Sequence, residues 1–188
     1  MWAYVICAAI WIGFILHWIF GSIPKRRVFE IYAGCGIGIC LTLLIFRLFR
    51  LFQNQKGILV LQVVGNFLYF FAILMAAITF VTIGFKGRPK GSIEDTTVLI
   101  ERGIFRIVRH PLYLALALWG IGLVLLTQSF LSLGLGMTAL FCFWMASKEE
   151  DEFNIKKFGD SYREYMGKAP MWNFLRGLKR TFYDAKRK

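Results

Sequence analysis

The chain has 188 residues, of which 57% are hydrophobic and 18% are charged, and its mean hydropathy is +0.58. Soluble domains carry about 25% charged residues, so this composition excludes an ordinary soluble protein and predicts an integral membrane protein. The formal net charge of +12 favours anionic lipid headgroups as partners over nucleic acid, because no nucleic-acid-binding motif accompanies the basic residues.

Uncharged stretches along the chain predict an all-α fold with five transmembrane helices. A helix needs about 20 apolar residues to cross the hydrocarbon region, and about 17 to 25 is the working range. The first 24 residues lack a basic start and a small-residue cleavage motif, so we expect a retained span there and not a signal peptide. The predicted spans cover residues 2–21, 30–51, 58–84, 111–127 and 130–147.

The last two spans are predicted to form a helical hairpin. The stretch from Pro111 to Ser147 contains no charged residue and is too long for one span, so we place a turn at Thr127-Gln128-Ser129. The whole chain, 1–188, is then a single membrane domain. It carries a cytosolic connector at 86–110, the two-span hairpin at 111–147, and a cytosolic C-terminal helical segment at 148–188.

The distribution of basic residues predicts the orientation of the chain. With five spans, 20 of the 23 Lys and Arg residues fall on one side of the membrane. The positive-inside rule then places the N-terminus outside and the C-terminus in the cytosol. The three basic residues on the opposite side are Arg47, Arg50 and Lys56, and we expect the two arginines to lie at the end of the second span.

The cysteines suggest neither a metal site nor a disulfide. The four cysteines all fall within predicted spans without the spacing of metal ligands, so we interpret them as buried thiols. Five glycines in the second and fifth spans would allow close helix contacts. The cysteines are Cys7, Cys35, Cys40 and Cys142, and the glycines are Gly34, Gly36, Gly38, Gly134 and Gly136.

The C-terminal segment predicts two helical parts. Residues 149–166 form the first, which Gly159 interrupts. In the second, apolar residues recur every three or four positions with basic residues between them, the pattern of an amphipathic helix on an anionic membrane surface. The apolar residues are Trp172, Leu175, Leu178 and Phe182, and the basic ones are Arg176, Lys179 and Arg180.

The segment Arg109-His110-Pro111-Leu112-Tyr113 is a candidate site at the start of the hairpin. Proline suits the first turn of a helix, so we expect the fourth span to begin at Pro111 with His110 as its cap. The free N–H groups and the helix dipole would favour a carboxylate or phosphate there. Taken singly, Arg109 could instead contact headgroups and Tyr113 could be an interfacial aromatic residue.

An acidic segment at 149–152 follows the hairpin, so we expect it on the same side of the membrane as Arg109 and His110. Glu152 has lysines four residues before and after it, the spacing of ordinary solvated ion pairs. Glu149 and Glu150 lie closer to the membrane without such partners. A carboxylate at that depth would face a cation or accept hydrogen bonds from sugar hydroxyls, and we favour Glu150 over Asp151 for this role.

Residues 97–166 resemble the superfamily of isoprenylcysteine carboxyl methyltransferases and phospholipid methyltransferases, which are integral membrane enzymes. The resemblance covers roughly the last half of the chain, and the order and spacing of its blocks make it fairly specific. The blocks are Gly103-Ile104-Phe105, Arg109-His110-Pro111-Leu112-Tyr113, the two-span hairpin, Glu149-Glu150 and Phe158-Gly159-Asp160-Ser161-Tyr162-Arg163-Glu164-Tyr165.

The resemblance implies a cytosolic pocket for S-adenosyl-L-methionine and methyl transfer to a lipid or small apolar acceptor. Counting back from Phe158 selects Glu150 as the acidic residue of the site, whereas the pattern ending at Phe153 selects Glu149. Candidate catalytic residues are Arg109, His110 and Tyr113. The implied cofactor-binding residues are Thr97, Val98, Leu99, Ile100, Phe105, His110, Pro111, Leu112, Tyr113, Glu149 and Glu150.

One departure from the resemblance concerns the acceptor. The isoprenylcysteine enzymes carry an arginine, associated with the substrate carboxylate, four residues before that glutamate, and this chain has Ala146 there. A carboxylate acceptor therefore loses its expected counter-ion unless Arg106 or Arg109 replaces it. Two other functions stay open, an NADPH-dependent sterol-reductase-like enzyme and a non-enzymatic membrane adaptor or transporter. Against a transporter, no charged residue falls in the middle of a span and no repeat is visible.

Overall fold

The computed structural model describes residues 1–51, 57–87 and 96–186, and every regular element within them is helical. The all-α prediction is therefore confirmed for these residues. Lys56, one of the three basic residues predicted on the opposite side, lies outside them. The helices are α1 (Trp2–His17), continued by the π-helical turn η1 (Trp18–Ser22), then α2 (Val28–Leu48), α3 (Leu59–Lys86), α4 (Ile104–Ile107), α5 (Pro111–Thr127), α6 (Phe130–Phe158), α7 (Asp160–Lys168) and α8 (Phe174–Lys186).

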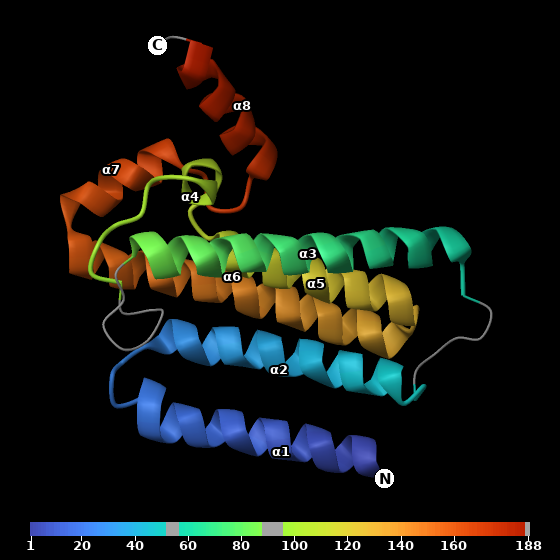
Figure 1. Ribbon diagram of the computed structural model, residues 1–188. Helices are drawn as coiled ribbons and strands as arrows, with labels where there is room; N and C mark the ends of the chain where they lie inside the picture. The colour runs from blue at the N-terminus through green and yellow to red at the C-terminus, as the bar shows by residue number, and fades with distance from the viewer. Residues whose placement is uncertain (52–56, 88–95, 187–188) are drawn as a thin grey trace.

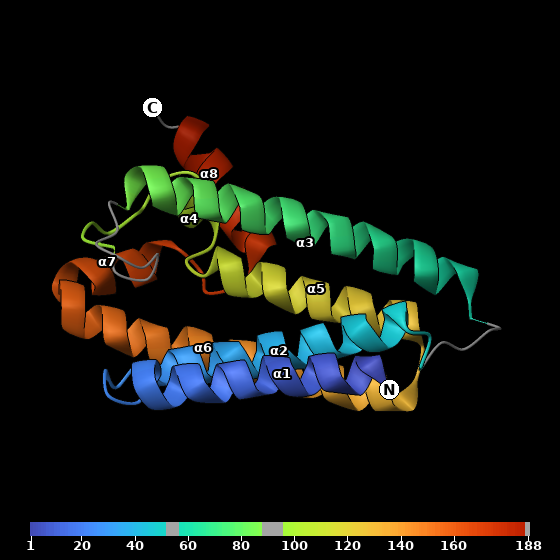
Figure 2. The ribbon, with the colours of Figure 1, turned by 60° about the horizontal axis from the view of Figure 1, so that its bottom comes forward.

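Four of these helices are long and apolar enough to cross a membrane, so the chain is an integral membrane protein. They are α1 with η1, α2, α3 and α6, while α5 is apolar but has only 17 residues. The count of five spans therefore stays a prediction. The five long helices lie side by side and alternate in direction, and α4, α7 and α8 gather at one end of the bundle (Figure 1). Figure 2 shows α3 on one side of α5 and the group α1, α2 and α6 on the other.

Glycines in α2 bring its neighbours into close contact, as their spacing in the sequence indicated. Gly36 faces α6, where an added Cβ would lie 2.5 Å from the ring of the fully buried Phe143. Gly34 faces the ring of Trp18 in η1, and Gly38 faces the ring of Trp11 in α1. The absence of side chains at these positions lets aromatic rings from two different helices pack directly against the α2 backbone.

The hairpin of α5 and α6 forms as predicted, with its turn at the expected residues. α5 ends at Thr127, and Gln128 adopts the left-handed conformation, with φ of +48°. Ser129 then begins α6 through a capping box with Ser132. The side chain of Gln128 also exchanges two hydrogen bonds with the backbone of Ile58, which ties the turn to the start of α3.

The last long helix extends well beyond its predicted span. α6 does not end at Ser147 but continues without a break to Phe158, for 29 residues. At 1.5 Å per residue such a helix is longer than the hydrocarbon thickness of about 30 Å. Its acidic end can therefore extend beyond the apolar region as part of the same continuous helix. Gly159, with φ of +62°, then breaks the helix and starts α7, as expected. The second span also differs slightly, because α2 ends at Leu48 and Arg50 lies in the turn that follows.

We predict that Gly36→Ala destabilises the bundle by about 1–3 kcal/mol, because the new methyl group overlaps a ring that has no room to move. Gly134→Ala is the matched control, since Gly134 is also helical but has no atom within 4 Å of an added Cβ. Thermal unfolding in detergent measures both variants. An equal midpoint for Gly36→Ala and Gly134→Ala would contradict the close packing of α2 on α6.

Candidate functional site

A pocket opens at the end of the bundle that carries α7. It includes ten of the twelve residues that the sequence selects as catalytic or cofactor-binding, and the two that do not line it are Thr97 and Glu149. Sequence segments far apart in the chain therefore meet around one cavity. The lining comprises Phe29, Ala33 and Ile37 of α2, Thr79 and Ile83 of α3, Thr96, Val98, Leu99, Ile100, Phe105 and Arg109 of the connector, His110, Pro111, Leu112, Tyr113 and Leu116 at the start of α5, Glu150, Phe153, Asn154 and Phe158 of α6, and Tyr162 and Tyr165 of α7.

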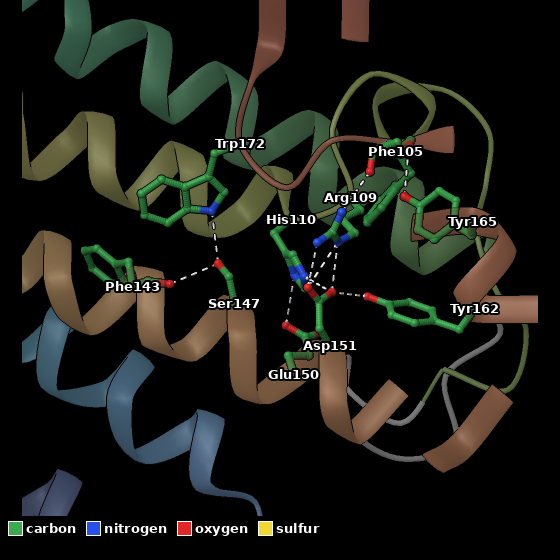
Figure 3. Close-up of polar contacts among 11 residues, drawn as sticks. Phe105, Arg109, His110, Phe143, Ser147, Glu150, Asp151, Tyr162, Tyr165 and Trp172 are labelled. Carbon is green, nitrogen blue, oxygen red and sulfur yellow. Dashed lines mark hydrogen bonds and ion pairs between the residues drawn. The ribbon is translucent and has the colours of Figure 1, made fainter. Parts of the chain in front are cut away.

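The pocket wall is organised around Asp151, whose side chain is nearly buried on α6. Arg109 donates to it twice, from Nε to Oδ1 at 2.9 Å and from Nη2 to Oδ2 at 2.8 Å (Figure 3). Tyr162 donates its hydroxyl to Oδ1 at 2.7 Å. Such a bidentate, buried arginine–carboxylate pair is geometrically specific, so Asp151 holds the start of α5 and the helix α7 in fixed positions on α6.

His110 lies between two carboxylates. Its Nε2 is 2.7 Å from Oδ1 of Asp151, and its Nδ1 is 3.5 Å from Oε2 of Glu150. Burial alone lowers the pKa of His110, but its hydrogen bonds with Asp151 and Glu150 outweigh that effect and raise the pKa to about 9. The imidazolium form, in which both ring nitrogens donate, therefore predominates at neutral pH. The ring also stacks on Tyr113, with centroids 5.8 Å apart.

The segment that joins α7 to α8 is hydrogen-bonded to Arg109 and to Ser147 of α6. Arg109 donates from its backbone N to the carbonyl of Pro170 at 3.0 Å and from Nη1 to the carbonyl of Ala169 at 2.9 Å. Trp172 donates from Nε1 to Oγ of Ser147 at 2.9 Å. Each of the three guanidinium nitrogens of Arg109 thus donates to the protein, and its charge is paired with Asp151.

Two tyrosines of α7 close the remaining side of the site. Burial, together with the negative charge of Asp151, raises the pKa of Tyr162 far above its usual value, so its hydroxyl keeps the proton that it donates. Tyr165 donates to the carbonyl of Phe105 at 2.7 Å. Through these two hydrogen bonds α7 is joined both to the acidic end of α6 and to the connector, which lines part of the pocket.

Glu150 has fewer ionic and hydrogen-bond partners than Asp151. Its side chain is 30% exposed and lines the pocket, and among the described residues its one ionic partner is His110, at 3.5 Å. Its carboxylate oxygens can therefore accept further hydrogen bonds from a ligand. Of the predicted cofactor-binding residues, Glu150 lines the pocket, whereas the exposed Thr97 and Glu149 do not, and their binding of a cofactor stays a prediction.

Several residues of the site had no recognisable signal in the sequence. Asp151 was ranked below its neighbour Glu150, although it is hydrogen-bonded to three residues that line the pocket, Arg109, His110 and Tyr162. The one sequence feature that pointed to Asp151 was its position, one residue after Glu150 and eleven before Tyr162. Phe29, Thr79 and Ile83 come from earlier spans whose sequences are simply hydrophobic, so their contribution depends on helix packing.

Comparison with known proteins agrees with this geometry. The sequence profile of the phospholipid methyltransferase family matches residues 60–161, more than half of the chain. The chain belongs to the phospholipid methyltransferase family. The matched region runs from the start of α3 to the start of α7 and so contains the hairpin, the Arg109–Asp151 pair and Glu150.

Among curated proteins, this family member is similar to several named protein-S-isoprenylcysteine O-methyltransferase. The protein from Xenopus laevis is 29% identical over 133 residues, which are 69% of this chain and 46% of the relative. The one from Schizosaccharomyces pombe is 31% identical over 107 residues, or 56% and 43% of the two chains. The human protein is 28% identical over 128 residues, or 66% and 45%. In each case the match spans less than half of the relative's length, and no solved structure matches the chain significantly.

We predict that Asp151→Asn lowers the free energy of unfolding by about 3 kcal/mol or more, because it removes the counter-charge of the half-buried Arg109 and one of the two carboxylates beside the buried His110. Glu152→Gln is the matched control on the next position of the same helix, where the side chain is exposed. The thermal midpoint of each purified variant measures the effect. Asp151 would have no structural role if both variants unfolded at the wild-type temperature.

Proposed function

We propose that the chain transfers a methyl group from S-adenosyl-L-methionine to a lipid or small apolar acceptor that reaches the site from the membrane. The observation that carries the proposal is the composition of the pocket, which joins a polar end at Glu150 and His110 to an apolar part between α2, α3 and α5. Family membership favours this function over the reductase and transporter alternatives.

The residues present suit this donor. Aromatic and aliphatic side chains such as Phe105, Leu99 and Phe158 supply an apolar wall for an adenine ring. Glu150 is available to accept hydrogen bonds from ribose hydroxyls or an amino group. α5 begins at Pro111, so the N–H of Leu112 has no partner within the helix, and Leu112 lines the pocket; a carboxylate is favoured at such a helix start.

The protein contributes positioning more than acid–base chemistry. S-adenosyl-L-methionine supplies a methyl group on a positively charged sulfur that is already activated for transfer. The pocket residues hold the reacting groups in line and exclude water, which accounts for much of the acceleration in such reactions. Because His110 is protonated at neutral pH, we assign it an electrostatic role and not that of a general base. Arg109 acts through Asp151 and the α7–α8 segment as a positioning residue.

The acceptor is proposed to be one that needs no paired carboxylate. Ala146 is fully buried among apolar residues, including Tyr113 and Phe143. Arg109, one of the cations considered as a replacement for the arginine missing at this position, is bound to Asp151 and Ala169. A neutral or amine-bearing lipid headgroup, or a small apolar thiol, therefore fits the site better than an anionic prenylcysteine.

We further propose that the pocket faces the cytosol. The chain ends on the same side of the bundle as the loop at 23–27, α7 and α8, where the basic residues concentrate. The positive-inside rule assigns that side to the cytosol, with the N-terminus outside and anionic headgroups next to the basic residues.

This orientation predicts how introduced cysteines react with an impermeant thiol reagent. A cysteine at Arg163, exposed on α7, should react from the cytosolic side, and one at Arg50, in the turn after α2, from the opposite side. Reaction of both from the same side would exclude an odd number of spans between them.

We predict that Glu150→Ala weakens binding of S-adenosylhomocysteine by about 1–3 kcal/mol, because a polar contact is lost from a largely dehydrated pocket. Glu152→Ala should bind like the wild type, since Glu152 is exposed and outside the pocket lining. Calorimetric titration of the purified proteins gives the affinities. If Glu152→Ala proved damaging and Glu150→Ala did not, the assignment of the donor site to this face of α6 would be wrong.

We predict that, when both are offered together with labelled S-adenosyl-L-methionine, phosphatidylethanolamine becomes methylated in preference to a farnesylated cysteine with a free carboxylate. The reason is that Ala146 lies in an apolar cluster and that Arg109 is bound to Asp151. Product analysis by mass spectrometry identifies the methylated species. Preferential methylation of the farnesylated acid would show that another cation has replaced the missing arginine.

A further inference from the structure

Two adjoining basic hollows, which share Lys168 and Arg180, lie beside the methyl-donor pocket, between α4, the end of α7 and α8. We call them together the basic groove. Arg106 and Glu101 line the first hollow, and Arg176 lines the second. Arg109 reaches its inner edge, but the charge of Arg109 is matched by Asp151. The groove therefore carries a surplus of positive charge that the methyl-transfer site does not use.

Two arginines of α8 are arranged to receive an anion in the groove. Arg180 is anchored through Nη1, which donates to the carbonyls of Gly167 and Lys168 at the end of α7. Its other guanidinium nitrogens make no hydrogen bond to the described part of the chain. The guanidinium of Arg176, four residues earlier on the same face of the helix, likewise has no ion-pair partner among the described residues. Lys168 is paired with the exposed Glu164, so the arginines supply most of the open positive charge.

The first part of α8 packs against the bundle. Gly177 lies directly against the backbone of α4, where an added Cβ would be 1.7 Å from the carbonyl oxygen of Ile107. Phe174 packs against the buried cluster of Met75, Val108 and Ala115. Only a glycine allows this approach, and the contact holds α8 beside the ends of α3 and α5.

The outer face of α8 presents apolar side chains next to the arginines. Leu175 and Phe182 are seven residues apart and therefore lie on one face of the helix, where they are 77% and 63% exposed. A soluble anion or an acidic peptide bound in the groove would leave both side chains in water. An anionic phospholipid satisfies both features at once, because its phosphate meets Arg176 and Arg180 while its acyl chains cover Leu175 and Phe182.

We propose that the basic groove is a binding site for the headgroup of an anionic phospholipid in the leaflet beside α8. The site is separate from the methyl-donor pocket and does not depend on the proposed methyl transfer. Charge complementarity supplies the headgroup contact, and the adjoining apolar face of α8 selects a lipid over a free phosphate.

The test is thermal unfolding of the full chain, purified in a neutral detergent, during titration with short-chain phosphatidylglycerol, phosphatidylcholine or inorganic phosphate. Phosphatidylglycerol should raise the midpoint in a saturable manner, and the other two should not. In Arg176→Gln/Arg180→Gln the apparent affinity for phosphatidylglycerol should fall by about thirtyfold, equivalent to about 2 kcal/mol. The matched control is Lys25→Gln/Arg26→Gln, which removes two exposed charges at the same end of the bundle and should respond like the wild type.

Three outcomes would overturn the proposal. Equal stabilisation by phosphatidylcholine would show that the charge is irrelevant, and equal stabilisation by inorganic phosphate would show that no lipid is selected. A wild-type response of the double variant would place the lipid elsewhere. If the double variant fails to fold, Arg176→Gln alone replaces it, with an expected loss of about fivefold in the same titration, and an unchanged affinity would equally reject the site.

Discussion

The carboxylate of Asp151 is the interaction on which the end of the bundle depends. It accepts hydrogen bonds from residues on three separate elements, namely the connector, the start of α5 and α7. Charged groups with so little exposure are stable only when their partners are complete, because each loses its hydration. The network therefore depends on all of its members, and it joins the elements that carry Glu150, His110 and the pocket walls.

The Asp151 network lies on the part of α6 that extends beyond the predicted membrane span. The helix packs on α2 where Gly36 admits the ring of Phe143, and continues for more than three turns beyond Ala146 to Phe158. The same packing brings Phe29 of α2 against Phe153 of α6, with ring centroids 5.3 Å apart, so a wall of the pocket comes from the first half of the chain. Close contact inside the bundle thus sets the geometry of the site at its end.

Charged residues around the pocket divide into those that hold the structure and those that face a ligand. Arg109 and Asp151 satisfy each other and the α7–α8 segment, which leaves them little capacity for anything else. Glu150 keeps open acceptor positions, and the basic groove keeps open donors on Arg176 and Arg180. This division explains why the same short cluster of ionisable residues can support both a rigid fold and the two ligand sites proposed here.

Much of the architecture follows from local features of the sequence. Hydrophobic length predicted the membrane helices, Pro111 and His110 predicted the start of α5, and Gly159 predicted the break before α7, because each depends on the backbone preferences of a few adjacent residues. The resemblance also selected ten of the 22 residues that line the pocket. Tertiary packing decided the rest: that α6 continues past Ser147, that Asp151 and not Glu150 joins Arg109, and that Phe29, Thr79 and Ile83 reach the pocket. Those features depend on which faces of distant helices meet, and a hydrophobic span carries almost no information about its own rotation, since lipid and protein interior are both apolar surroundings for its side chains.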